Sequence, residues 1–130
     1  CLHVEDDMML QLTISARLFA REGVEYRVAS DGQEALDIVN EREACGEPPF
    51  NLVLLDNQMP RLDGVECCRR LRQLGFLDQI IIGMTGDPIG SPDRAAFEAA
   101  GLNACVDKTM DGLEAVQAQV ESLVQAATGP

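Results

Sequence analysis

The chain alternates short apolar runs with longer segments in which apolar residues recur at helical spacing. Short continuous apolar runs are typical of parallel strands that are covered on both faces. The runs predict strands at Cys1–Val4, Tyr26–Ala29, Phe50–Leu55, Ile80–Met84 and Ala104–Val106. Each run is followed by a helical segment, and crossovers between parallel strands are right-handed. We therefore expect an α/β fold of the (βα)5 type, with a doubly wound, parallel five-stranded sheet.

Helix starts are marked by capping residues ahead of the apolar stripes. The first helix is expected over residues 8–22, with one apolar face at every fourth position. Three acidic residues are each followed by a glutamate three positions later, and a serine precedes a proline, as at a helix start. The expected capping residues are Asp31, Asp63, Ser91 and, for the last helix, Asp111.

Composition narrows the possible functions. The 130 residues suit one domain, and 46% of them are hydrophobic. Ten basic against 22 acidic residues give a net charge of −12, which argues against binding to nucleic acid or to an anionic membrane. No apolar run is long enough to span a membrane, and no signal peptide pattern is present. We expect a domain over residues 1–126 and a disordered tail over 127–130.

The cysteines indicate the compartment. There are five, an odd number, without a C-x-x-C pair, and the chain has one histidine. Zinc sites need Cys and His pairs at short spacing, so a zinc site is not expected. Reduced thiols in the cytoplasm are the simplest interpretation. Because the chain begins with Cys1 rather than Met, we expect it to be a piece of a longer protein.

Polar residues follow four of the predicted strands. The pair Glu5-Asp6 follows the first, Asp56 ends the third, Thr85 ends the fourth and Lys108 follows the fifth. The carboxyl ends of parallel strands meet at one edge of the sheet, where open α/β sheets bind ligands. Three carboxylates beside a hydroxyl and an ammonium suggest a divalent-cation site that handles a phosphoryl group.

Each of these residues also has a structural interpretation. An acid pair before a helix is commonly a capping feature, and an aspartate that ends a strand is commonly a turn residue. A lone lysine is usually on the surface, and a lone threonine is a good strand residue. Asp63-Gly64 and His3 are expected to be structural, the first as a cap with close packing and the second as a packed strand residue.

The motifs and their order along the chain resemble those of a known protein family. The stretch Val4-Glu5-Asp6-Asp7, the run from Leu54 to Gly64 (LLDNQMPRLDG), the turn Met84-Thr85-Gly86 and Lys108 resemble the receiver domain of two-component response regulators. The resemblance covers nearly the whole chain, from Leu2 to about Val124. It implies a flavodoxin-like fold with strand order 2-1-3-4-5.

The resemblance also implies a magnesium site and a phosphoacceptor. Asp56 would accept the phosphoryl group, since a carboxylate can attack phosphorus and form an acyl phosphate. Mg²⁺ would be bound directly by Asp6, by Asp56 and by the backbone carbonyl of Gln58, and through water by Glu5. Lys108 would pair with Asp56 and then with a phosphoryl oxygen.

Further roles follow from the same resemblance. Thr85 would donate its hydroxyl to the phosphoryl group and move on activation, and Gly86 would leave room for the phosphohistidine. Gln58 and Asp87 occupy positions that tune autodephosphorylation in the family. Cys105 stands at a switch position that often holds an aromatic residue, so an aromatic rotamer switch cannot operate.

One residue departs from the family pattern. Receiver domains usually carry a proline joined by a cis bond after the lysine, and this chain has Thr109. A cis bond to a non-proline residue costs about 3 kcal/mol, so we predict a trans Lys108–Thr109 peptide and a shifted loop. A shifted loop would misplace Lys108 and weaken phosphorylation.

The leading hypothesis is a phospho-accepting switch whose donor is a histidine kinase or a histidine phosphotransfer protein. Phosphorylation would shift the face of helix 4, strand 5 and helix 5 between two states. The protein would catalyse its own phosphorylation and slow autodephosphorylation, alone or as part of a hybrid histidine kinase. The Asn57-Gln58-Met59-Pro60 motif favours the hybrid kinase.

One alternative is a pseudo-receiver that only binds proteins. Another is a Mg²⁺-dependent phosphohydrolase, which would need a second aspartate where Gln58 stands.

Overall fold

Five parallel strands form one sheet. The computed structural model describes residues 1–19, 24–57, 59, 62–75 and 79–128. The strands are β1 (Leu2–Val4), β2 (Arg27–Ala29), β3 (Leu52–Asp56), β4 (Ile80–Thr85) and β5 (Ala104–Asp107). They pair in the order β2-β1-β3-β4-β5, and every neighbouring pair is parallel. The expected (βα)5 architecture and the strand order 2-1-3-4-5 are confirmed.

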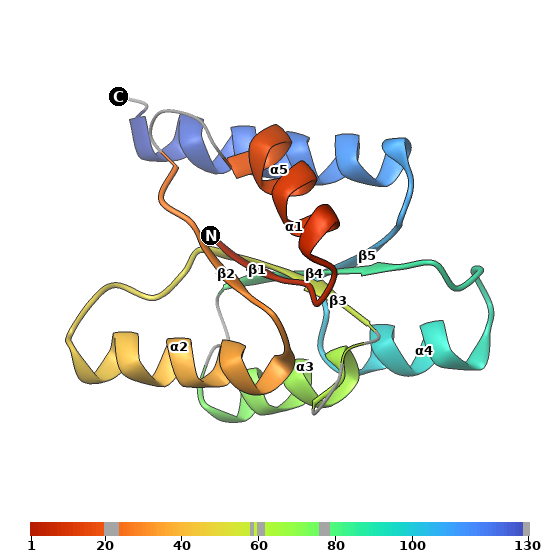
Figure 1. Ribbon diagram of the computed structural model, residues 1–130, viewed down its shortest axis with the longest axis horizontal. Helices are drawn as coiled ribbons and strands as arrows, with labels where there is room; N and C mark the ends of the chain where they lie inside the picture. Colours follow the sequence, from red (N-terminus) through yellow and green to blue (C-terminus); the bar gives the residue numbers. More distant parts are fainter. Residues whose placement is uncertain (20–23, 58, 60–61, 76–78, 129–130) are drawn as a thin grey trace.

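Helices cover both faces of the sheet. They are α1 (Met8–Ile14), α2 (Gly32–Ala44), α3 (Gly64–Gln73), α4 (Pro92–Ala99) and α5 (Met110–Thr128). α1 and α5 lie on one face, and α2, α3 and α4 lie on the other (Figure 1). α5 extends into the segment 127–130 that was predicted as a disordered tail, and residues 129–130 lie outside the described residues. No helix in the described part of the chain is long and apolar enough to cross a membrane.

The first helix differs from the prediction of one α-helix over residues 8–22. α1 ends at Ile14, and a π-helix, η1 (Ser15–Phe19), continues it. Residues 20–22 lie outside the described residues. Ile14 and Leu18 are both buried. Their spacing of four fits an α-turn and the wider π-turn alike, so the apolar pattern could not distinguish the two.

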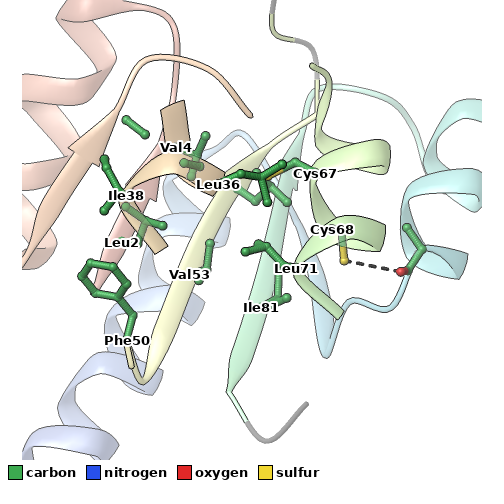
Figure 2. Packing of buried hydrophobic residues seen from close by; sticks show 14 of the residues in the cluster. Leu2, Val4, Leu36, Ile38, Phe50, Val53, Cys67, Cys68, Leu71 and Ile81 are labelled. Carbon is green, nitrogen blue, oxygen red and sulfur yellow. Dashed lines mark hydrogen bonds between the residues drawn. The ribbon is translucent and has the colours of Figure 1, made fainter. Parts of the chain in front are cut away.

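Two apolar cores lie on opposite faces of the sheet. One packs β1, β3 and β4 against α2, α3 and α4 (Figure 2). Cys67 and Cys68 belong to it, and the Sγ of Cys68 lies 3.5 Å from the carbonyl oxygen of Ala100. Burial raises the pKa of Cys67 to about 12, so this thiol stays protonated. The other core packs the strands against α1, η1 and α5.

Three of the expected caps are confirmed, and one is wrong. The side chains of Asp31, Asp63 and Ser91 accept hydrogen bonds from the first turns of α2, α3 and α4. α5, however, begins at Met110, and the hydroxyl of Thr109 accepts from the amide of Gly112 at 3.2 Å. Asp111 therefore lies inside the helix. Its spacing to Glu114 imitated a capping box two residues too late.

Candidate functional site

The polar residues at the strand ends share one pocket at the carboxyl edge of the sheet. Its volume is about 360 Å³. The lining residues are Glu5, Asp6, Asp7, Leu10, Asp56, Asn57, Thr85, Gly86, Asp87 and Lys108. The structure thus brings together the acid pair, the strand-end aspartate, the threonine and the lysine that the sequence singled out. Gln58 lies outside the described residues.

Three carboxylates lie at the base of this pocket. The parallel register pairs Val4 with Leu55, so Glu5 and Asp56 follow neighbouring positions at the ends of β1 and β3. Glu5 is 1% exposed and Asp56 6% exposed, while Asp6 is exposed. One oxygen from each of the three lies within 4.8 Å of the others. This compact set of hard oxygen donors suits a small divalent cation such as Mg²⁺.

Lys108 provides the positive charge of the site. Its Nζ lies 2.8 Å from Oδ1 of Asp56 and 3.1 Å from Oε1 of Glu5. Its backbone amide donates to the carbonyl of Thr85 at 2.9 Å, which anchors the residue to the neighbouring strand. Burial lowers the pKa of Lys108, but the hydrogen bond and the charge of Asp56 outweigh burial, so its pKa is raised overall.

Glu5 has a strongly perturbed proton affinity. Burial, and then the charge of Asp56, raise the pKa of Glu5 to about 7, although Lys108 and the amide of Asp7 oppose this. Two buried carboxylates therefore compete for one ammonium. Extra positive charge in the pocket would lower the cost of keeping both ionised.

Thr85 ends β4 inside the pocket and is 2% exposed. Its Oγ1 accepts a hydrogen bond from the amide of Asp87 at 3.0 Å, so the hydroxyl proton is available to a second partner. Asp87 also accepts a hydrogen bond from Nδ2 of Asn57 at 3.4 Å. A Cβ on Gly86 would meet no atom within 4 Å, so the pocket is open beside Thr85.

Gly64, at the start of α3, packs closely against the end of β3, the strand that carries Asp56. A Cβ on this residue would overlap the carbonyl oxygen of Asp56 and crowd Asn57 and Phe97. Its amide donates to the carbonyl of Asn57 at 2.8 Å. These contacts agree with the structural interpretation of Asp63-Gly64 as a cap with close packing.

The loop after Lys108 has the predicted trans peptide. No cis peptide bond occurs among the described residues, which include Lys108 and Thr109. The amide of Thr109 donates to the carbonyl of Asp107 at 2.8 Å, and its own carbonyl accepts from Leu113 at 3.0 Å. With its hydroxyl as the cap of α5, Thr109 is held at three points, and Lys108 still reaches Asp56.

Two residues that do not line the pocket, Cys105 and Arg94, also bear on the site. Cys105 is half-buried on β5 and does not line the pocket. Sequence reasoning missed Arg94, a residue of α4 that is 5% exposed and donates to the carbonyl of Cys105 at 3.2 Å. Its position three residues before the buried Phe97, on the same helix face, was the available signal.

Comparison with known proteins assigns the class. The model of the response regulator receiver domain matches residues 2–120. Two-component response regulator 24 of Arabidopsis thaliana is 31% identical over 107 residues, which cover 82% of this chain and 72% of that protein. The chain belongs to the receiver domain family of two-component signalling. Receiver domains act together with histidine kinases or phosphotransfer proteins.

Relatives occur in different contexts. Histidine kinase CKI1 of Arabidopsis thaliana is 31% identical over 130 residues, a match that covers 92% of this chain but 12% of the kinase. The solved receiver domain of CKI1, complexed with Mg²⁺ and BeF3−, superposes with a TM-score of 0.76 at 30% identity, covering 93% of this chain and 88% of that one. A Francisella receiver domain gives a TM-score of 0.76 at 22% identity, with 98% and 97% covered.

Proposed function

We propose that this domain is a phospho-accepting switch in which Asp56 takes a phosphoryl group from a phosphohistidine. The observation that carries the proposal is the convergence of Asp56 with Lys108 and Thr85 in one pocket, with Lys108 Nζ 2.8 Å from Asp56. A nucleophile, a cation and a hydroxyl donor are the groups that acyl phosphate formation requires.

The residues of the pocket have distinct tasks in this reaction. A carboxylate oxygen of Asp56 attacks phosphorus, the phosphorus–nitrogen bond of the donor breaks, and the electron pair stays on the donor nitrogen. Lys108 passes from Asp56 to a phosphoryl oxygen. Thr85 donates a hydrogen bond from its hydroxyl to another phosphoryl oxygen. The hydroxyl proton is available for this bond because the Oγ1 atom only accepts from the amide of Asp87. The opening beside Gly86 admits the imidazole of the donor.

Mg²⁺ is the proposed cofactor. Glu5, Asp6 and Asp56 would hold it, together with the backbone carbonyl of Gln58. When bound, the cation offsets the negative charge that the carboxylates and the phosphoryl group bring together. The carboxylate cluster supports this proposal, as does the complex of the CKI1 receiver domain with Mg²⁺.

The phosphodonor is proposed to be a histidine kinase or a histidine phosphotransfer protein. α1 begins directly after Asp7, which lines the pocket, and it carries three exposed apolar side chains. Met8, Met9 and Leu12 are 72%, 73% and 65% exposed. Exposed apolar side chains beside a reactive pocket are suited to docking a protein partner. Relatives of both contexts, separate regulators and kinases, match the chain.

The output is proposed to be a shift of the face formed by α4, β5 and α5. Thr85 lies in β4 beside β5, and its movement toward a phosphoryl group would pull on the loop that leads to α4. Cys105 cannot serve as an aromatic switch, so the coupling depends on Thr85 and on the backbone. Gln58 and Asp87 are the residues proposed to tune slow autodephosphorylation, and Asp87 lines the pocket.

Intact-protein mass spectrometry after incubation with acetyl phosphate tests the proposal. One phosphoryl adduct is expected with Mg²⁺ and none with chelator or in Asp56→Asn. Asp63→Asn is the matched control, because it removes a carboxylate at an exposed helix cap and should leave the adduct intact. Absence of any adduct, also with a phosphorylated histidine protein as donor, would contradict the proposal and favour the pseudo-receiver.

A further inference from the structure

Arg94 is a buried cation that the reaction described above does not use. It lies in the first turn of α4, after the cap Ser91, and is 5% exposed. Arginine is almost never buried in this way unless its guanidinium is paired and hydrogen-bonded. Its partners therefore indicate why the residue is placed there.

The partners of Arg94 come from three segments. Nη1 donates to the carbonyl of Asp87 at 3.2 Å, in the loop between β4 and α4. Nη2 donates to the carbonyl of Cys105 at 3.2 Å, and Nη1 also pairs with Oδ1 of Asp107, both on β5. Nε reaches Oε1 of Glu98, on α4 itself, at 3.3 Å. One planar guanidinium thus joins the loop after β4 to the end of β5.

Both of these segments lead directly to the reactive groups. Asp87 donates its amide to the hydroxyl of Thr85, and Asp107 precedes Lys108 in the chain. Thr85 and Asp107 are also register partners between β4 and β5. A displacement of either segment would move the hydroxyl or the ammonium away from Asp56.

We propose that Arg94 is a positioning residue for phosphoryl transfer, which holds Thr85 and Lys108 in place through the backbone on either side of them. This inference rests on the proposed function and adds to it a residue outside the pocket. The three carboxylates lie on or just after β1 and β3, whereas the hydrogen bonds and ion pairs of Arg94 go to the loop after β4, to β5 and to α4 itself. Loss of Arg94 is therefore expected to slow phosphorylation while the carboxylates that would hold the cation keep their places.

The chain offers a matched control in Arg72. This arginine donates to the carbonyls of Gly101 at 2.9 and 3.0 Å and of Gln79 at 3.0 Å, and to Oδ1 of Asn103 at 2.8 Å. It joins the same two strands at their amino ends, away from the pocket. Loss of either arginine removes several hydrogen bonds to backbone, but only Arg94 is connected to Thr85 and Lys108.

The test compares wild type, Arg94→Met, Arg94→Lys, Asp107→Ala and Arg72→Met. For each, the rate of phosphorylation by acetyl phosphate at saturating Mg²⁺, the Mg²⁺ dissociation constant by calorimetry and the urea midpoint are measured. Arg94→Met should slow phosphorylation about tenfold, as expected for slightly misplaced reactive groups. Its Mg²⁺ dissociation constant should shift by less than the about tenfold change expected when the charge of Lys108 itself is removed, because the ammonium and the three carboxylates all remain in this variant.

The other variants separate positioning from general stability. Arg72→Met should lower the urea midpoint and keep the wild-type rate. Arg94→Lys and Asp107→Ala, which keep part of the network and the fold, should give intermediate rates. Equal slowing in Arg94→Met and Arg72→Met, or wild-type rates in all three network variants, would overturn the inference. No phosphorylation of the wild type would overturn the proposed function itself, and this inference with it.

Discussion

The Nζ atom of Lys108 lies 2.8 Å from Oδ1 of Asp56 and offsets part of the negative charge of the pocket. The same ammonium lies 3.1 Å from Oε1 of Glu5, so it is shared by two carboxylates that are almost fully buried. Such carboxylates repel each other, and the shared cation offsets part of that repulsion. Lys108 and a bound divalent cation would therefore compensate the same negative charge.

This arrangement predicts that Lys108→Met binds Mg²⁺ more tightly and is phosphorylated more slowly. Loss of a nearby positive charge should lower the Mg²⁺ dissociation constant about tenfold, since like charges a few ångströms apart repel by a kcal/mol or more. Loss of the contact to the phosphoryl group should slow phosphorylation at least about tenfold. Calorimetry and the mass-spectrometric assay measure the two effects.

The control for this variant is Arg70→Met. Arg70 is paired with Glu66 on the exposed side of α3, so the substitution changes the net charge equally at a distance from the pocket. It should alter neither quantity. Weaker Mg²⁺ binding in Lys108→Met would mean that the ammonium positions the carboxylates rather than competing with the cation.

Gly64→Ala should disturb the strand that carries Asp56. The added Cβ would overlap the carbonyl oxygen of Asp56, and overpacking against backbone typically costs about 1–3 kcal/mol. Gly86→Ala is the comparison for stability, since its Cβ would meet no atom within 4 Å. Urea unfolding should show a lower midpoint for the first variant and a nearly unchanged one for the second. Equal midpoints would show that α3 moves aside at no cost.

Thr109 is predicted to stabilise the start of α5. Its hydroxyl accepts from the amide of Gly112, and loss of such a cap costs about 1 kcal/mol. Thr109→Ala should therefore lower the free energy of unfolding by that amount, and Thr109→Ser, which keeps the hydroxyl, should restore most of it. Two equally destabilised variants would assign the effect to the lost methyl group instead.

Much of the fold followed from local patterns. The apolar runs and the acidic caps of α2 and α3 depend on neighbours within a few residues, so the sequence was sufficient to predict them. The meeting of Asp56, Thr85 and Lys108 followed from one rule of topology, that parallel strands end at the same edge. The resemblance then supplied the strand order and the proposed roles.

The parts that escaped prediction depend on distant partners. Arg94 is buried because the carbonyls of Asp87 and Cys105 face it, and no local pattern indicates where carbonyls from two other segments will lie. The start of α5 was misplaced because Asp111 and Glu114 imitate a capping box, whereas Thr109 is favoured by its contacts with Asp107 and Gly112. Local sequence patterns can suggest several capping or buried residues, but contacts with distant segments determine which of them the fold uses.

Burial of His3 is predicted to make the free energy of unfolding depend on pH. Burial, and then the charge of Lys108, lower the pKa of His3 from 6.5 to about 4. Between these two pH values His3 is protonated in the unfolded chain but not in the folded chain. The contribution of His3 to the free energy of unfolding is therefore fully present above pH 6.5. It should be lost as the pH falls to 4, by up to about 3 kcal/mol.

His3→Gln isolates this contribution from those of other groups. Glu5 has a raised pKa of about 7, so its contribution has the opposite sign, present below pH 4.5 and lost as the pH rises through 7. Both proteins carry Glu5, and its contribution cancels in the difference between them. As the pH falls from 7 to 4.5, urea unfolding should show the wild type losing stability relative to His3→Gln. A difference between the two proteins that does not change with pH would mean that His3 titrates normally in the folded state.

Phosphoryl transfer to Asp56 is tested most directly by locating the phosphoryl group in the chain. After incubation with acetyl phosphate and Mg²⁺, borohydride reduces an aspartyl phosphate to homoserine, which tryptic digestion and mass spectrometry can place in the chain. The tryptic peptide of residues 43–61 contains Asp56 as its sole aspartate. We predict homoserine at Asp56 and at no other aspartate. Homoserine at Asp6 or Asp63, with Asp56 unmodified, would show that Asp56 is not the phosphoacceptor.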